Sequence, residues 1–360
     1  MWRHRRAATL LRFNPMHAAA LGMLLAALSP VVPPVPVPAV GTAKGGVAIA
    51  ALPSSSPWAA VALSLRRPDG LGDSLGDGRA RTALAVMAAA AATVAGRELG
   101  PDRPGSGVEV DATTEHLTVV IVVPATNADL AVKAIDAALK VLRGPPPKTT
   151  PPLPALTGGR GPLPPGDADV AAALKAVAPV DASDVAVASI GPGPGADLLR
   201  RTGLLLTTTL PKTTKPTTDT SARTPASATT MAWRLKTPAP GLHAAVEVLG
   251  ALVGGTVRRT ADGLVLMVDG GDHGRAMLEG VTDAPPPPDI VAEAAARRRL
   301  ELALPLLDVP ALVRRLADDL VDDPGHDDAG ASLEVIDALG AVGPADVSRA
   351  AAALVAGGVQ

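Results

Sequence analysis

Cysteine and tyrosine are absent from this sequence, and three tryptophans and one phenylalanine are its only large aromatic side chains. Without cysteine the chain can form no disulfide bond, thiolate metal site, cysteine nucleophile or lipid-modified cysteine. With so few aromatic rings, alanine, valine and leucine must fill the core, and each of them buries less apolar area than a ring does. We therefore expect modest stability per residue.

An excess of charge of either sign is also lacking. The net charge is -2, and 47% of the residues are hydrophobic. A nearly neutral chain has no basic footprint for nucleic acid, so we exclude a nucleic-acid binder. The apolar content is sufficient for a buried core. Because a single core stops growing at roughly 250–300 residues, a chain of 360 residues predicts two domains.

No Asp or Glu occurs in the first 68 residues, which have the charge order of an export signal. Several arginines precede the apolar run Ala18–Leu28, which is shorter than the roughly 20 residues that span a bilayer. A proline-rich stretch follows, and the small residues Gly41, Thr42 and Ala43 offer a cleavage site before Lys44. We interpret residues 1–43 as a signal peptide or uncleaved anchor.

This leader predicts an exported protein of the periplasm or cell envelope, with membrane contact only through the leader. A mitochondrial presequence shares the arginine-rich, acid-free composition, but the proline-rich exit argues against it.

Apolar runs bounded by turn residues predict strands and helices in residues 44–206. Strands are expected at Gly46–Leu52, Ala59–Leu65, Val108–Val123 and Val185–Ile190. Helices are expected at Arg79–Gly96, from a cap at Asn127 or Asp129 to Leu142, at Asp169–Ala178 and at Ala196–Leu206. The first two strands are separated by a Pro- and Ser-rich turn and read as a hairpin or a strand-turn-strand unit. Residues 144–166, rich in Pro, Gly and Thr, are expected to form a loop.

Residues 207–230 consist almost entirely of Thr, Pro, Ser, Ala and Lys, a composition typical of a solvated linker. The second half then repeats the β-then-α order of the first. Strands are expected at Met231–Leu235 and Gly263–Val268, and helices at Leu242–Val253, Asp289–Leu304, Val309–Leu320, Leu333–Leu339 and Asp346–Leu354. The repeated order predicts an α+β fold with two α+β units.

Five segments, in the correct order, resemble the M16 metallopeptidases, the family of insulinase, pitrilysin and the mitochondrial processing peptidase. They are Ala83–Ala91, Val110–Leu142, Ala182–Leu199, Met231–Gly255 and Leu333–Leu354. The resemblance spans most of residues 45–356. It implies two homologous M16-type (LuxS/MPP-like) α/β sandwich domains, truncated relative to the family. Residues 44–206 would be the N-terminal domain, 207–230 the linker and 231–360 the C-terminal domain.

The resemblance also shows what chemistry is missing. The zinc helix of the family carries the motif HxxEH, in which two His bind zinc and the Glu activates water. The matching places hold Val86, Ala89 and Ala90, which can neither bind a metal nor accept a proton. We find no counterpart of the family's third ligand, a downstream Glu. The Arg/Tyr pair that holds substrate in the family is also lost, although Arg258 or Arg259 stands near the arginine's place. We expect no catalytic residue, metal or cofactor.

A non-catalytic binding or scaffolding subunit is therefore the leading hypothesis. The family resemblance implies pairing with an active M16 peptidase chain, or with another copy of this chain, and contact with unfolded peptide. Two alternatives stay open: a metallopeptidase with an unrecognised metal site, and a stand-alone structural protein of the envelope.

Other polar groups favour structural interpretations. The acidic segment Asp318–Asp328 is dense enough for a cation but lacks the Gly and the alternating ligands of a calcium loop, so an acidic helix end is expected. Asp269, Asp272 and His273 are expected in a solvated turn, and Gly191–Gly195 in a turn. His116 and His243 have no partners nearby in the sequence and are expected to be structural or exposed. Arg297–Arg299 are expected on a solvated or salt-bridged helix face, with a partner contact as the alternative.

Overall fold

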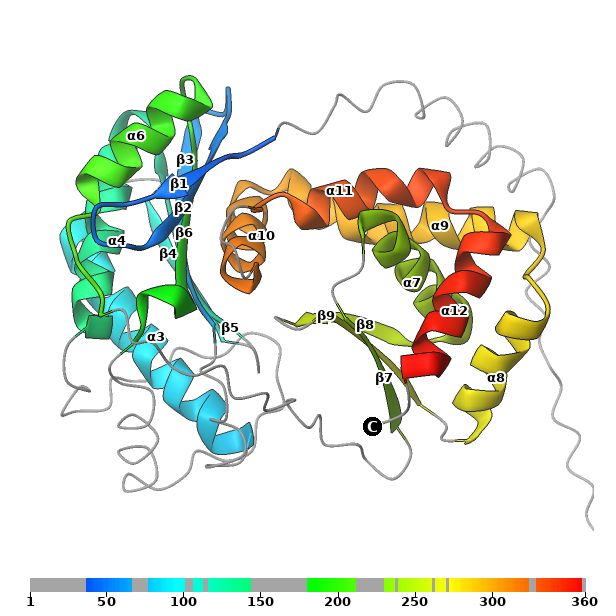
Figure 1. Ribbon diagram of the computed structural model, residues 1–360. Helices are drawn as coiled ribbons and strands as arrows, with labels where there is room; N and C mark the ends of the chain where they lie inside the picture. The colour runs from blue at the N-terminus through cyan, green and yellow to red at the C-terminus, as the bar shows by residue number, and fades with distance from the viewer. Residues whose placement is uncertain are drawn as a thin grey trace, which may run out of the picture. The chain divides into compact units, whose positions relative to one another are not determined.

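Two β-sheets with helices packed on them make up the computed structural model of the protein (Figure 1). The structure describes residues 37–66, 77–100, 106–112, 116–143, 180–211, 230–236, 239–260, 263–269, 272–323 and 328–357. The described residues are a mixture of helix and strand, as the sequence pattern predicts.

The first sheet has six strands in the order β1-β2-β6-β3-β5-β4. They are β1 (Ala39–Thr42), β2 (Ala48–Pro53), β3 (Trp58–Arg66), β4 (Gly107–Ala112), β5 (His116–Pro124) and β6 (Val185–Gly191). β2 and β6 are parallel, and the other neighbours are antiparallel. The sheet is therefore mixed, and its central strands come from distant parts of the chain.

The two faces of β3 carry side chains of different size. Residues alternate between the faces of a strand, so each face receives every second residue. Val61, Leu63 and Leu65 of β3 belong to the larger apolar core. Helices α3 (Asp77–Leu99) and α4 (Ala128–Arg143) supply the other side of that core, while α6 (Gly195–Leu205) packs beside them on β2. The alternate residues of β3, mostly alanines, face α10 (Val309–Asp322), which packs across β3, β6 and β5 (Figure 1).

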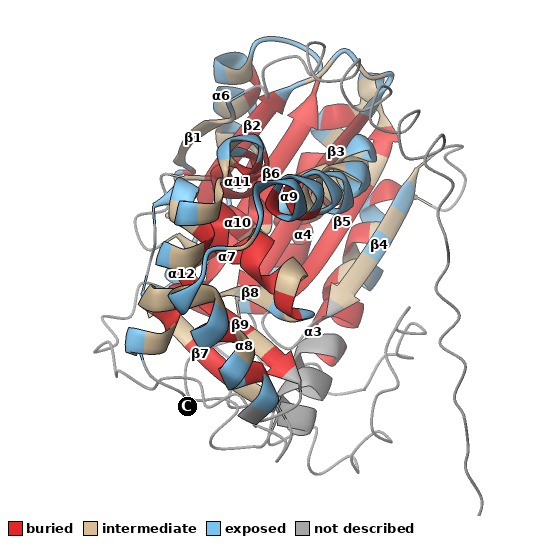
Figure 2. Ribbon diagram, turned by 90° about the vertical axis from the view of Figure 1, so that its right-hand side faces the viewer, coloured by how far each residue is buried: buried red, intermediate tan, exposed pale blue. Residues whose placement is uncertain are grey.

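Burial on both faces explains why these strands read as continuous apolar runs rather than as an alternation of apolar and polar residues. β3 from Ala59 to Leu65 and all of β6 are buried (Figure 2). Small side chains on the α10 side allow that helix to approach closely.

The second sheet is antiparallel, with the order β7-β9-β8. Its strands are β7 (Thr230–Lys236), β8 (Thr256–Thr260) and β9 (Gly263–Asp269). The helices of this half are α7 (Pro240–Val253), α8 (Asp272–Asp283), α9 (Pro288–Ala303), α11 (Ala331–Ala338) and α12 (Pro344–Gly357). Short 3-10 helices lie at Ala125–Asn127, Ala182–Asp184, Leu304–Leu307 (η3) and Leu339–Ala341. Trp233, which is 1% exposed, is the largest buried side chain of the second core.

Helix α7 shows how local sequence sets the boundaries of an element. Pro240 occupies the first turn, where its missing N–H costs nothing. Gly254 ends the helix with φ of 68°, a left-handed conformation that favours glycine. Between them a nearly continuous apolar run fills the second core.

The predicted elements at Gly46–Leu52, Ala59–Leu65, Arg79–Gly96, Val185–Ile190 and Ala196–Leu206 are confirmed within a few residues, as are all seven predicted in the second half. Among the strands and α-helices of the described ranges, β1, β8 and α8 were not predicted, and neither were the short 3-10 helices. Helix 169–178, loop 144–166 and most of linker 207–230 lie outside the described residues.

Two strand predictions need correction. β2 and β3 do not form a hairpin, because β6 lies between them. The single strand expected at Val108–Val123 is instead β4 and β5, which pair antiparallel with each other. No Gly or Pro separates Ala112 from His116 in the sequence, so no turn signal marked the point where one strand ends and the next begins.

The two ends of the predicted first domain also differ in detail. β1 lies within the segment that we assigned to the leader, and it pairs with β2. A cut before Lys44 would therefore remove an edge strand of the sheet. At the other end, Thr208 and Leu210 are buried while Thr207 and Thr209 are exposed, so the start of the predicted linker packs against the first core. The leader and its cleavage stay predictions.

No helix of the described ranges is long and apolar enough to cross a membrane.

Asp136 on α4 holds residues 207–211 in place. It accepts hydrogen bonds from the backbone N–H groups of Thr207 and Thr208, both at 2.8 Å, and from the Thr207 hydroxyl at 2.9 Å. Nζ of Lys140 lies 3.2 Å from Oδ2 of Asp136, the oxygen that also accepts from the Thr207 hydroxyl. Burial alone would raise the pKa of Asp136, but these hydrogen bonds bring it below its ordinary value of 3.8.

We expect Asp136→Asn to lower the free energy of unfolding near neutral pH by about 1.5–3 kcal/mol, because charge-assisted hydrogen bonds are lost. A carboxylate whose pKa is depressed by folding contributes stability above its unfolded pKa, and that stability is lost as the pH falls through the folded pKa. The wild type should therefore lose stability below pH 3.8, whereas the variant should lose less there. Urea unfolding of both proteins across that range measures the difference. Parallel acid profiles would contradict this role of Asp136.

Candidate functional site

The segment that resembles the M16 zinc helix in sequence lies in α3, and this helix packs in the first core. Val86 is fully buried, Ala89 is 3% exposed, and Ala90 is also buried. Val86 belongs to the cluster that α3 forms with the sheet and with α4. Over the whole described part of the chain, no group of three or more His, Asp or Glu side chains lies in an arrangement that would hold a metal ion.

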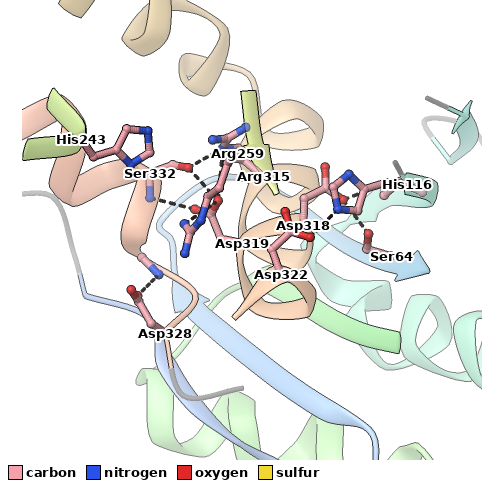
Figure 3. Close-up of polar contacts among 12 residues, drawn as sticks. Ser64, His116, His243, Arg259, Arg315, Asp318, Asp319, Asp322, Asp328 and Ser332 are labelled. Atoms are coloured by element: carbon pink, nitrogen blue, oxygen red, sulfur yellow. Dashed lines mark hydrogen bonds and ion pairs between the residues drawn. The ribbon is translucent and has the colours of Figure 1, made fainter. Parts of the chain in front are cut away.

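The acidic segment near the end of α10 is buried rather than solvated, which corrects the sequence interpretation. Asp319 is 2% and Asp322 is 7% exposed, and Asp318 is half-buried. Each of the three accepts a hydrogen bond or pairs with a cation from another element (Figure 3). Asp328 accepts a bond from the backbone N–H of Gly330 at 2.8 Å. His326 and Asp327 lie outside the described residues.

One side of α10 is bonded to the first sheet. The hydroxyl of Ser64 donates to Oδ1 of Asp318 at 2.6 Å, and that of Thr118 donates to the same oxygen at 3.0 Å. Nε2 of His116 lies 2.8 Å from Oδ1 of Asp322. Burial raises the pKa of Asp318 above its ordinary value, although His116 and the two hydroxyl bonds act in the opposite direction.

The other side of α10 is bonded to α11 and β8. Oδ1 of Asp319 accepts from the Ser332 hydroxyl at 2.6 Å, and Oδ2 accepts from the Ser332 backbone N–H at 2.9 Å. Nε of Arg315 donates to Oγ of Ser332 at 2.6 Å and lies 3.3 Å from Asp319. Nη1 of Arg259 lies 3.5 Å from the same carboxylate. Arg259 is one of the two arginines that stand near the place of the substrate-holding arginine in the sequence comparison with M16 peptidases.

A pocket of about 260 Å³ adjoins this network. Its polar lining comes from α7, α9, α10 and α11: His243, Glu247, Glu301, Arg314, Arg315, Asp318 and Ser332. Its apolar lining is Leu302, Pro305, Leu306, Ala311, Val335 and Ile336. Charged groups and aliphatic walls therefore meet in one concave site, the arrangement typical of small-ligand pockets.

Glu247, at the α7 wall of the pocket, is neutralised within the protein. Nη2 and Nε of Arg298 lie 2.8 and 2.9 Å from its Oε2, and Nε2 of His243 lies 3.5 Å from Oε1. Burial alone would raise the pKa of Glu247, but the bonds from His243 and the charge of Arg298 lower it overall. Arg298 also pairs with Glu301 at 3.1 Å.

Of the remaining groups singled out in the sequence, His243 lines this pocket and the others do not. The Arg297–Arg299 run is a salt-bridged face, as expected. Gly191–Gly195 is the turn between β6 and α6, also as expected. Asp272 and His273 open α8 instead of lying in a turn after Asp269. His116 and His243, expected to be structural or exposed, are mostly buried, and each faces a carboxylate.

Sequence reasoning missed Ser64, Thr118, Ser332 and Glu247. A signal existed for the first two, because each is a lone hydroxyl within an otherwise apolar strand. Such a residue on a buried strand requires a hydrogen-bond partner.

No protein-family model and no curated protein sequence matches the chain. Solved structures do match its fold. A chain of complex III2 from Candida albicans, determined with Inz-5 bound, aligns with 87% of this chain and 92% of its own length, with a TM-score of 0.56 and 14% identity. A protease from Helicobacter pylori aligns over 88% and 96%, with a TM-score of 0.54 and 11% identity. These similarities establish a common fold.

Proposed function

We propose that this protein is a non-catalytic member of the M16 metallopeptidase fold, with two related α+β domains, that works as a binding or scaffolding subunit beside an active M16 peptidase chain. The proposal depends on the composition of α3. Its residues at the motif places, Val86, Ala89 and Ala90, are apolar and are buried. The fold shared with a protease and with a chain of a multi-subunit complex supports the proposal.

At the places of the HxxEH motif, both the zinc ligands and their access to solvent are missing. A zinc-binding helix presents two imidazoles and a carboxylate to a solvent-accessible metal. In α3 the matching side chains carry no lone pair, and Val86 packs inside the core of the first sheet. A metal at this position would need both new ligands and a route for water, so inactivity is the simpler account.

Exposed leucines offer a surface for a partner chain. Leu300, Leu304 and Leu307, at the end of α9 and in η3, are 50%, 53% and 82% exposed. They follow one another at helical intervals of four and three residues. Large apolar side chains that are exposed close together often mark protein contacts in soluble proteins. We assign the contact with the active peptidase chain to these leucines.

The absence of catalysis is tested on the purified full chain. We expect no stoichiometric zinc by mass spectrometry and no EDTA-sensitive cleavage of an unstructured peptide. One equivalent of tightly bound zinc, together with cleavage that EDTA abolishes, would overturn the proposal.

The binding role is tested by co-expression with an M16 chain that has an intact HxxEH motif. We expect the two chains to co-purify and the double substitution Leu304→Glu with Leu307→Glu to abolish this. Leu204→Glu is the matched control, because Leu204 on α6 is 68% exposed and lies outside the leucine surface. Recovery of the wild-type chain as a lone monomer would count against the partner. Equal losses in both variants would show that the surface was wrongly assigned.

A further inference from the structure

The last two turns of α10 place two carboxylates and a histidine against each other at the first sheet. Asp318 and Asp322 stand one helical turn apart on the side of α10 that meets β3 and β5, and His116 of β5 lies opposite them (Figure 3). Nε2 of His116 is 2.8 Å from Oδ1 of Asp322, and the two side chains are 13% and 7% exposed. Solvent and salt therefore screen these charges little.

The other charged groups around this cluster, within the described ranges, have partners of their own. Arg66, opposite His116 in the register of β3 and β5, pairs with Asp184 at 3.1 Å. Arg315 lies on the other side of α10, 3.3 Å from Asp319. The remaining pairs are Arg259 with Asp319, Arg314 with Asp111 and Glu109, Arg298 with Glu247 and Glu301, and His243 with Glu247, while Asp323 accepts from the backbone N–H of Asp328.

His116 is therefore the cation that acts most directly on the two carboxylates. Burial raises the pKa of Asp318, and His116 opposes that rise more strongly than Arg315 does. The hydroxyl of Ser64, 2.6 Å from Asp318, supplies a hydrogen bond but no charge. The balance of charge at this end of α10 thus depends on the imidazole.

The position of these carboxylates on the helix is unfavourable without a cation. Like charges at positions i and i+4 of a helix repel each other. The C-terminal end of a helix also carries the negative pole of the helix dipole, which disfavours carboxylates and favours cations there. Both effects apply here, because Asp322 is the last residue of α10. A protonated His116 reduces both.

The charge of an imidazole changes near pH 6.5, within the range that proteins ordinarily meet. A neutral His116 can still donate from Nε2 to Asp322, because one ring nitrogen keeps its proton. The hydrogen bond then persists while the ion pair is lost. A histidine that gains a carboxylate partner on folding contributes stability that is fully present below about pH 6.5 and is lost as the pH rises above it.

We propose that His116 is a pH-sensitive latch, which holds the C-terminal end of α10 on the first sheet when its imidazole is protonated and loosens that end when it is neutral. The latch strengthens as the pH falls from about 8 to about 6. Asp318 acts in the same direction. Burial raises its pKa, and a carboxyl whose pKa is raised by folding stabilises the folded state as the pH falls.

Amide hydrogen exchange of the full chain, followed by mass spectrometry, measures the opening of this helix end. Protection factors are compared, because they correct for the intrinsic effect of pH on exchange. We expect residues 316–322 of the wild type to be about 10-fold more protected at pH 6 than at pH 8, since a nearby opposite charge shifts an ionisation by one pH unit or more. Equal protection at the two pH values overturns the proposal.

His116→Gln keeps a donor for Asp322 but has no ionisable group. We expect the pH difference in residues 316–322 to fall to about 3-fold or less in this variant. His273→Gln is the matched control, because His273 is an exposed histidine at the start of α8, and it should keep the wild-type difference. A His116→Gln variant that keeps the full difference overturns the proposal, since loss of a merely structural contact would lower protection equally at both pH values.

Asp318→Asn separates the titration of His116 from that of Asp318, since asparagine keeps an oxygen for Ser64 and Thr118 and cannot ionise. We expect residues 316–322 of this variant to stay about 3- to 10-fold more protected at pH 6 than at pH 8. Adding His116→Gln should make protection at the two pH values about equal. A double variant with the same pH dependence as Asp318→Asn overturns the assignment to His116.

If these variants fail to fold, as thermal unfolding will show, NMR of the wild type decides. The midpoint of the change in α10 protection should coincide with the midpoint of the His116 imidazole titration. Midpoints that differ by more than about one pH unit overturn the proposal. The latch does not rest on the role as a binding subunit, because zinc content and co-purification decide that role and amide exchange decides this one.

Discussion

Replacement of Asp319 by alanine is expected to lower the free energy of unfolding by about 3–5 kcal/mol, the cost of removing one partner from a buried ion pair. Asp319 is 2% exposed and accepts two hydrogen bonds from Ser332, at 2.6 and 2.9 Å. It also lies 3.3 Å from Nε of Arg315 and 3.5 Å from Nη1 of Arg259. Alanine would leave two donors of Ser332 and the buried Nη1 of Arg259 without their carboxylate.

Urea unfolding followed by circular dichroism measures this loss. Asp337→Ala is the matched control, because Asp337 is an aspartate on α11 whose side chain is 52% exposed and lies 3.9 Å from Arg299. An exposed pair of this kind contributes about 0–1 kcal/mol. If Asp319→Ala costs no more than the control, the α10 network does not stabilise the fold as described.

Much of the secondary structure could be predicted from the sequence because it depends on local pattern. The alanine-rich composition of α3 and the proline and glycine at the ends of α7 act within a few residues. The order of the strands could not be predicted in the same way. β6 lies between β2 and β3 although more than a hundred residues separate it from them. No local pattern in β2 or β3 indicates that insertion.

The candidate site was misread for a related reason. Aspartates grouped near a helix end are usually solvated, and composition alone gives Asp318 and Asp322 that interpretation. Their partners are far away in sequence: Thr118 is 200 residues from Asp318, and His116 is 206 residues from Asp322. Only the folded chain brings these groups together. The places of Val86, Ala89 and Ala90 were predicted correctly as helical, because a resemblance located them and local composition agreed.

Replacement of Trp233 by alanine is expected to lower the free energy of unfolding by about 3–5 kcal/mol, because a large side chain is removed from a packed core and leaves a cavity. Trp233 is 1% exposed in the second core. The chain supplies its own control in Trp58, which starts β3 and is 40% exposed. Trp58→Ala should change the free energy of unfolding by about 0.5 kcal/mol or less, as surface substitutions do.

The same experiment tests whether the two sheets unfold together. Helix α10 follows the second sheet in the chain, yet it is bonded to the first sheet through Asp318 and Asp322. Loosening of the second core around Trp233 should therefore reduce the stability of the first sheet as well. We expect Trp233→Ala, with Trp2 also replaced by Phe so that Trp58 is the one remaining tryptophan, to unfold in one transition at a lower urea concentration, with circular dichroism and the fluorescence of Trp58 changing together. A variant in which circular dichroism falls in two steps, with the Trp58 signal following only the second, would show that the α10 contacts do not couple the sheets.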